Sequence, residues 1–124
     1  KILAIGGGGF LGAVSRYLLA TAVENQFKPD QFPMGIAVVN ILGCFLIGIL
    51  AALFELKEWM NVELRMFVFA GLLGGFTTFS TLINDTFLLG KDGEMISAFL
   101  NVGGQVIVGL LFVWLGYFLV RMFT

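Results

Sequence analysis

Four long apolar stretches constrain this chain more than any other feature. They lie at about residues 2–23, 35–54, 66–89 and 94–120. A helix needs about 20 residues to cross the roughly 30 Å hydrocarbon core of a bilayer, and each stretch is long enough to do so. The sequence therefore predicts an all-α membrane protein with four transmembrane helices, forming a single transmembrane domain over residues 1–124.

The composition supports a chain that folds in lipid. Hydrophobic residues make up 59% of the chain and charged residues 12%, whereas soluble domains carry about 25% charged residues. The net charge of −1 predicts no nucleic-acid partner. There is no histidine, and the one cysteine, Cys44, excludes an internal disulfide. Because no acid pair is expected inside the membrane either, acid–base chemistry has few groups to use, and we predict that the protein is not an enzyme.

The positive charges give almost no preference for one orientation. With four spans, both termini and the middle loop share one side of the membrane. The cations of that side are Lys1, Lys57, Arg65 and Arg121, and those of the other side are Lys28, Lys91 and, if it snorkels that way, Arg16. Orientation follows the Lys/Arg bias, which is nearly absent here. Such a chain can insert both ways and pair as an antiparallel dimer.

Several polar residues fall inside the predicted spans. Arg16 lies about 21 Å along its span, where it is either a snorkelling anchor or a positive charge at the mouth of an anion path. Asn40 either joins two helices by a hydrogen bond or offers an uncharged donor to an anion. The fourth span places Ser97, Asn101 and Gln105 on one helical face. That face borders either a wet track or a polar seam between helices.

The segment "GLLGGFTTFSTLIND", residues 71–85, predicts a helix that is broken mid-membrane. Its glycine pair weakens the helix, and the hydroxyls that follow compete for the freed carbonyls. Irregular backbone at membrane depth is tolerated only where it is buried in protein or lines a water-filled cavity. A break would expose carbonyls, which coordinate cations, and hydroxyls, which donate to anions. Asp85 adds an ionisable group, which makes it a functional-site hypothesis.

Small residues also predict how the helices pack. Gly8 and Gly12 are four residues apart, as are Gly71 and Gly75. This spacing is typical of close contacts between membrane helices. Near the C-terminus, Trp114, Tyr117 and Arg121 are interpreted as anchors at the membrane–water interface.

At these residues the chain resembles the Fluc (CrcB) family of microbial fluoride channels. The resemblance rests on "SRY", "GIAVVNILGCFLIG", "AGLLGGFTTFST" and "LGYFLV", which together cover essentially the whole chain. It implies a multi-pass protein of the cell inner (plasma) membrane that forms an antiparallel dual-topology dimer with two narrow pores. Fluoride would pass down its electrochemical gradient, which lowers its cytoplasmic concentration. The partners implied are fluoride, the lipid bilayer, and a second copy of the chain or a homologous subunit.

The resemblance also implies roles for individual residues. Asn40 would be the pore-facing amide, Phe79 the first of two phenylalanines whose ring edges face the ion, and Arg16 the charge near the aqueous vestibule. A structural sodium ion would lie at the dimer centre, held by the main-chain carbonyls of Gly74 and Thr77 from each subunit. The full set of implied pore residues is Arg16, Asn40, Phe79, Ser80, Thr81, Leu82, Asn101 and Gln105.

Leu82 departs from the family pattern, which has the second pore phenylalanine at this position. Three consequences are possible: conduction tolerates the leucine, the pore is impaired, or a homologous partner subunit supplies the aromatic ring. Two other functions remain as alternatives. A small dual-topology multidrug or cation exporter would need a membrane-embedded acid in its first helix, where this chain has Arg16. A non-conducting subunit would leave the hydroxyl-rich break without a purpose.

Overall fold

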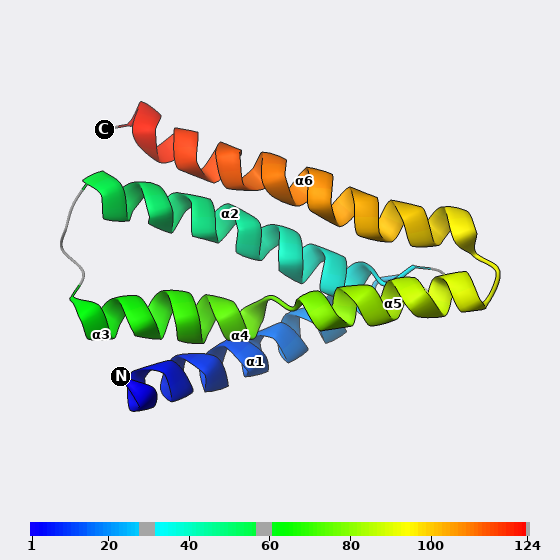
Figure 1. The fold of residues 1–124 in the computed structure, drawn as a ribbon, viewed down its shortest axis with the longest axis horizontal. Helices are drawn as coiled ribbons and strands as arrows, with labels where there is room; N and C mark the ends of the chain where they lie inside the picture. Colours follow the sequence, from blue (N-terminus) through cyan, green and yellow to red (C-terminus); the bar gives the residue numbers. More distant parts are fainter. Residues whose placement is uncertain (28–31, 57–60, 124) are drawn as a thin grey trace.

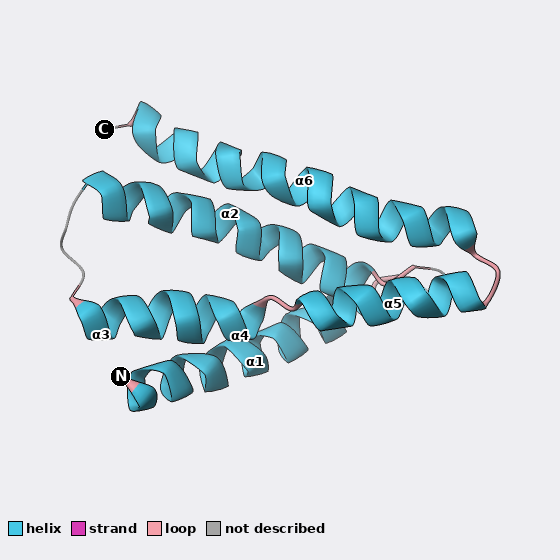
Figure 2. Ribbon diagram, in the orientation of Figure 1, coloured by secondary structure: helices cyan, strands magenta, loops and turns pink. Residues whose placement is uncertain are grey.

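The computed structural model describes residues 1–27, 32–56 and 61–123, and every regular element in these ranges is a helix. The helices are α1 (Ile2–Glu24), α2 (Met34–Leu56), α3 (Val62–Arg65), the π-helical η1 (Met66–Leu73), α4 (Gly74–Phe76), α5 (Phe79–Lys91) and α6 (Met95–Met122) (Figures 1 and 2). Four helical stretches, Ile2–Glu24, Met34–Glu55, Val62–Lys91 and Met95–Met122, are long and apolar enough to cross a membrane. The prediction of an all-α fold with four helices able to span a membrane is confirmed for the described residues.

The chain runs back and forth through the bundle, so that both termini lie at the same end (Figure 1). The C-terminal end of α2 and the start of α3 lie at this end as well. The turn between α5 and α6 closes the opposite end, and Gly93 adopts a φ of 84° there, which glycine tolerates and other residues avoid. Of the seven cations used above to compare the two sides, Lys28 and Lys57 lie outside the described residues.

Large apolar side chains cover the outer surface of the bundle. Phe10 is 68% exposed, Phe99 70% and Ile107 63%. An apolar surface of this extent is a liability in water and the normal surface of a protein in lipid. The few large polar side chains inside the bundle are therefore the unusual feature, and they gather at one place.

Glycine contacts bring helix backbones together at several places in the bundle. A Cβ at Gly8 would collide with the carbonyl oxygen of Phe67, and one at Gly75 would lie 2.8 Å from the carbonyl oxygen of Gly9. Gly8, Gly12, Gly71 and Gly75 thus form one contact between α1 and the η1–α4 segment, here called the glycine seam, as their spacing predicts. A second close approach, between α2 and α6, depends on Gly48 and Gly116 and was not predicted.

The third span is interrupted at Thr77 and Thr78, here called the break. Thr77 has φ −94° and ψ 155°, and Thr78 has φ −149° and ψ 125°, so both are extended. Gly74 is itself helical, with φ −62° and ψ −37°. The interruption therefore lies within the segment 71–85 that the sequence predicted to be broken, after the glycine pair rather than at it. Gly75 remains helical because its surface is needed against α1, and the interruption falls on the hydroxyl residues that follow.

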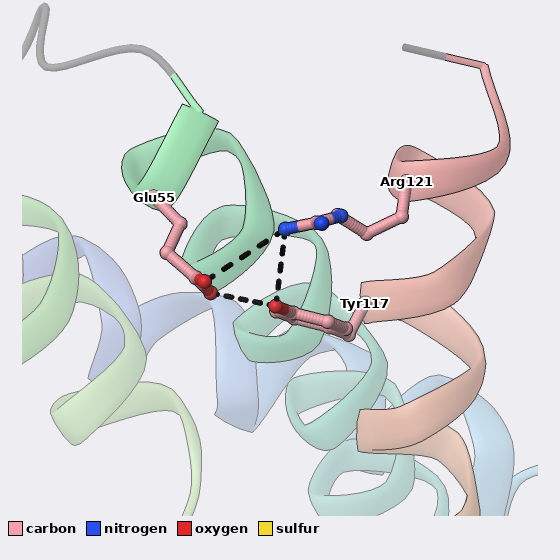
Figure 3. Close-up of polar contacts among 3 residues, drawn as sticks. All are labelled: Glu55, Tyr117 and Arg121. Atoms are coloured by element: carbon pink, nitrogen blue, oxygen red, sulfur yellow. Dashed lines mark hydrogen bonds and ion pairs between the residues drawn. The ribbon is translucent and has the colours of Figure 1, made fainter.

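Three side chains tie α2 to α6 at the end that holds the termini (Figure 3). The Tyr117 hydroxyl donates to Glu55 Oε2 over 2.8 Å, and Arg121 Nη1 lies 3.8 Å from Glu55 Oε1. The Arg121 guanidinium also donates to the Tyr117 oxygen over 3.5 Å. The sequence suggested Tyr117 and Arg121 as interfacial anchors. In the structure they bond to each other and to Glu55.

Candidate functional site

A cavity of about 250 Å³ lies beside the break, between α2, α5 and α6. Its lining residues are Asn40, Gly43, Cys44, Ile47, Thr77, Thr78, Phe79, Leu82, Gln105 and Val106. Most of this wall is apolar, and amide and hydroxyl groups are set into it without any charged side chain among the lining residues. Such a site can hold a small solute by hydrogen bonds from uncharged groups.

Asn40 joins α2 to the break by pairing with the backbone of Thr78. The Thr78 N–H donates to Asn40 Oδ1 over 3.0 Å, and Asn40 Nδ2 donates to the Thr78 carbonyl over 3.2 Å. Gly43 permits this approach, because a Cβ there would collide with the Thr77 side chain. An unpaired backbone group in an apolar environment is costly. The amide of Asn40 therefore takes the place of the helical hydrogen bonds that the break removes.

Thr78 caps the helix that starts after the break. Its Oγ1 accepts a hydrogen bond from the Thr81 N–H over 3.4 Å, which is the usual contact of an N-cap residue. The same hydroxyl lies 3.3 Å from Ser80 Oγ and 3.3 Å from Thr81 Oγ1. The Thr77 hydroxyl donates back to the Leu73 carbonyl over 3.0 Å. The hydroxyl-rich run thus ends one helix and begins the next.

From Asn40 a chain of hydrogen bonds continues through α6 and returns to α5. Asn40 Nδ2 donates to Gln105 Oε1 over 2.8 Å, and Gln105 Nε2 donates to Asn101 Oδ1 over 2.9 Å. Asn101 Nδ2 then donates to Thr86 Oγ1 over 3.0 Å, and that hydroxyl donates to the Leu82 carbonyl over 2.8 Å. Asn101 is fully buried and Gln105 is 8% exposed. We call Asn40, Gln105 and Asn101, with their hydrogen bonds, the amide chain.

The structure brings only some of the predicted site residues to the cavity. Asn40, Thr77, Phe79, Leu82 and Gln105 line it. Asn101 is connected to it through Gln105, while Ser80 and Thr81 lie on the first turn of α5 and reach it only through Thr78. The remaining residues, Arg16, Gly74 and Asp85, are not among its lining residues. Arg16 lies half-buried on α1, and within the described part of the chain it has no hydrogen bond or ion pair.

The break changes the environment of the two carbonyls that the sequence assigned to a cation. In a continuous α-helix the Thr78 N–H would donate to the Gly74 carbonyl, but here it donates to Asn40 instead. Thr77 precedes the N-cap, and the Thr81 N–H that would reach its carbonyl donates to the Thr78 hydroxyl. Carbonyl oxygens without a helical donor suit hard cations. Among the described residues no group of three or more His, Cys, Asp or Glu side chains could hold a metal ion, so any cation here would depend on such oxygens.

Two residues that organise the site were not singled out from the sequence. Thr78 was noted only as one hydroxyl of the run, whereas its backbone is the partner of Asn40. Thr86 was not among the predicted site residues, although its hydroxyl accepts the last hydrogen bond of the amide chain. A sequence signal for Thr86 does exist: it lies four residues after Leu82 and therefore on the same face of α5.

The comparisons with known proteins agree with one another. The family described as "CrcB-like protein, Camphor Resistance (CrcB)" matches residues 3–117. A relative named fluoride-specific ion channel FluC, from Prosthecochloris aestuarii, is 41% identical over 123 residues, covering 99% of this chain and 94% of the relative. The protein of the same name from Shewanella halifaxensis is 43% identical over 97% of this chain and 95% of its own length. That from Hydrogenovibrio crunogenus is 42% identical over 94% of this chain and 87% of its own length.

Proposed function

The chain belongs to the CrcB family, and from that premise we propose that it is a fluoride-selective channel that lets fluoride leave the cytoplasm passively. Its relatives are named as ion channels, so the chain belongs to a family of transport proteins and is not an enzyme. Its four apolar helices make it a multi-pass membrane protein. The membrane in which it would act is the cell inner membrane.

The single observation that carries this proposal is the set of uncharged polar groups at the break. Asn40, Gln105 and Thr78 meet at a cavity with an otherwise largely apolar wall. Fluoride is small and strongly hydrated, so a pore must replace the water it removes with other donors. Conduction also requires that the ion can leave again. Amide N–H groups, hydroxyls and the positive edges of aromatic rings meet both needs, whereas a buried lysine would hold the anion too tightly.

We further propose an antiparallel dual-topology dimer with two pores. Phe79 supports this arrangement, because it lines the cavity and yet is 73% exposed on a single chain. Gly103 and Gly104 on α6 support it too, since a Cβ at either would meet no atom within 4 Å. A second copy would cover the Phe79 ring, and its helices have room to approach at these glycines. The nearly even Lys/Arg distribution allows both orientations.

A structural sodium ion at the centre of this dimer is part of the proposal. The Gly74 and Thr77 carbonyls lack their α-helical donors, and Gly74 is exposed on the single chain. The same two oxygens from a second copy would complete a set of hard oxygen ligands. A fixed cation would add positive potential near the anion path. Arg16 would act at the aqueous vestibule, and Ser80, Thr81 and Asn101 would support the path from the next turn of helix.

Leu82 favours one second candidate, a subunit that conducts only beside a homologous partner. Its side chain is 6% exposed and lines the cavity next to Phe79, but leucine has no polarised ring edge to present to an anion. Either the Phe79 ring and the amides suffice, or a partner must supply a second ring.

Fluoride efflux from liposomes that contain the purified chain alone tests both candidates. The release of fluoride is followed by electrode, and chloride-loaded liposomes are the control. Fast fluoride release with negligible chloride release supports a self-sufficient channel. If the wild-type chain is inactive and Leu82→Phe restores flux, the chain needs a partner's aromatic ring. If well-folded protein of both kinds releases no fluoride, the channel proposal is wrong.

A further inference from the structure

The hydrogen bonds beside the break run in one direction from end to end. In order from donor to acceptor they connect Thr78, Asn40, Gln105, Asn101, Thr86 and the Leu82 carbonyl. Both ends consist of backbone groups that cannot reverse, because the Thr78 N–H can only donate and the Leu82 carbonyl can only accept. The flip state of an amide side chain is normally an assignment. Here the two fixed ends determine it for all three amides.

This direction decides which amide still has a free donor. Both hydrogens of Asn40 Nδ2 are used, one by the Thr78 carbonyl and one by Gln105. Gln105 Nε2 donates one hydrogen to Asn101, and within the described part of the chain its other hydrogen has no acceptor. Gln105 lines the cavity and Asn101 does not. The amide N–H available to an anion in the cavity therefore belongs to Gln105, and Asn40 acts by holding the break and Gln105 in place.

Thr86 fixes the far end of the amide chain without touching the cavity. Its one hydroxyl hydrogen goes to the Leu82 carbonyl, so its oxygen is left to accept from Asn101. Asn101 is fully buried, and without that acceptor its NH₂ group would be unsatisfied in an apolar interior. Asn101 would then turn to find another partner. Its Oδ1 would move away from Gln105 Nε2, which is held by no other acceptor.

We propose that Thr86 is a positioning residue of the anion path: its hydroxyl terminates the amide chain and thereby directs the free N–H of Gln105 into the cavity. The role assigned to the anion rests on the proposed function, whereas the effect of Thr86 on Gln105 does not. Thr86 itself is not among the residues that line the cavity, and its hydrogen bonds reach the cavity amide Gln105 through Asn101.

The transport test compares side chains that differ only by the hydroxyl. Thr86→Val keeps the shape of threonine, and the pair Thr86→Ser and Thr86→Ala repeats the comparison in a smaller side chain if the valine variant does not fold. We expect Thr86→Val and Thr86→Ala to raise the fluoride concentration for half-maximal flux roughly tenfold, as for the loss of one hydrogen bond to a buried amide. Thr86→Ser should remain near wild type. Thr21→Val, which removes an exposed hydroxyl of α1, is the matched control.

The second readout does not depend on transport. In protein labelled with ¹⁵N-glutamine, the two side-chain amide protons of Gln105 should give separate NMR signals. The proton bonded to Asn101 should be displaced from the chemical shift of a free glutamine amide, and the other proton should not. The two signals are assigned to Gln105 by their loss in Gln105→Met. Thr86→Val should move both signals, Thr86→Ser should restore them, and added potassium fluoride should shift the free proton of the wild type. If Gln105 responds to Thr86→Val but the wild type carries no fluoride, the proposed function fails and the positioning role stands. Unmoved Gln105 signals in Thr86→Val, or equal impairment by Ser and Ala, would overturn it.

Discussion

The two halves of this bundle differ in how much they depend on polar side chains. At the glycine seam, α1 meets the η1–α4 segment backbone to backbone, and the contact depends on side chains that are absent. Around the break, α2, α5 and α6 are joined by polar side chains that pair with one another and with the backbone. Lipid offers neither a hydrophobic driving force between helices nor water for unpaired polar groups. Close packing and internal hydrogen bonding are the two solutions that remain. The α1 side relies on close packing, whereas the α2–α6 side adds hydrogen bonds to its own glycine contact at Gly48 and Gly116.

The glycine seam and the amide chain also differ in what they can contribute to function. Backbone contact through glycine presents no polar side chain to a solute, so the glycine seam can only pack helices together. The amide chain holds its helices with the same kinds of group that can solvate a small anion. We infer that the first half supports the break mechanically and that the second half combines support with the proposed transport. Added volume should damage the first half, and lost polar atoms the second.

The largest effect is expected at the glycine seam. A Cβ at Gly12 would collide with the Leu72 carbonyl and lie 2.8 Å from the Phe76 amide nitrogen. Since neither backbone group can move aside cheaply, Gly12→Val should lower the free energy of unfolding by about 3 kcal/mol or prevent folding. Thermal unfolding in detergent measures this. Gly6→Ala in the same helix, where nothing lies within 4 Å, is the control and should be neutral or stabilising. Equal effects would show that α1 does not depend on this contact.

Removing the Asn40 amide should have the next largest effect. Asn40→Ala leaves the Thr78 N–H and carbonyl, and the Gln105 oxygen, without their partner. Each unsatisfied buried group costs about 1–3 kcal/mol before water or rearrangement compensates, so a net loss of about 2 kcal/mol is expected, with loss of fluoride flux. Chemical unfolding and liposome efflux measure the two effects. Asn84→Ala on the exposed face of α5 should change neither, and an unaltered Asn40→Ala protein would refute the pairing.

A smaller effect is expected from the cap of α5. Thr78→Val removes the hydroxyl that accepts from the Thr81 N–H but leaves the backbone that pairs with Asn40. Loss of an N-cap costs about 1 kcal/mol, and Thr78→Ser should recover it. The melting temperature reports the difference. If Thr78→Val proves as destabilising as Asn40→Ala, the hydroxyls around Thr78 rather than the Asn40 amide stabilise the break.

The sequence predicted the glycine seam better than the amide chain for a physical reason. Glycines spaced by four make a flat helix face wherever the helix lies, so the pattern is local and visible. The partners of Asn40 lie 38 and 65 residues away in the chain, and only the register of three helices brings them together. The polar character of Asn40, Asn101 and Gln105 could be seen in the sequence. Their order and direction could not.

The break shows the same limit. The run "GGFTTFST" predicted an interrupted helix from a weakening glycine pair and competing hydroxyls, but it did not show which of these residues would leave the helix. Propensity makes Gly74 and Gly75 the weakest helical positions, yet packing against α1 keeps Gly75 helical. The helix is instead interrupted at Thr77 and Thr78, because Asn40 and the hydroxyls supply hydrogen bonds to an extended backbone there. The predicted sodium ion, second copy and paired pores remain predictions, since they depend on contacts beyond one chain.

The smallest effect is expected at the end of the bundle, where the polar contacts are exposed rather than buried. Glu55 bonds Tyr117 and pairs with Arg121, but the side chains of Glu55 and Arg121 are 58% and 46% exposed. Water competes for such groups, and exposed ion pairs contribute about 0–1 kcal/mol.

Glu55→Gln, which retains an acceptor for Tyr117, should therefore lower the free energy of unfolding by less than about 1 kcal/mol. The difference should shrink further as salt screens the charges. Unfolding of both proteins at low and high salt measures it. A loss as large as that of Asn40→Ala would mean that the α2–α6 pair is held from its end rather than from the amide chain.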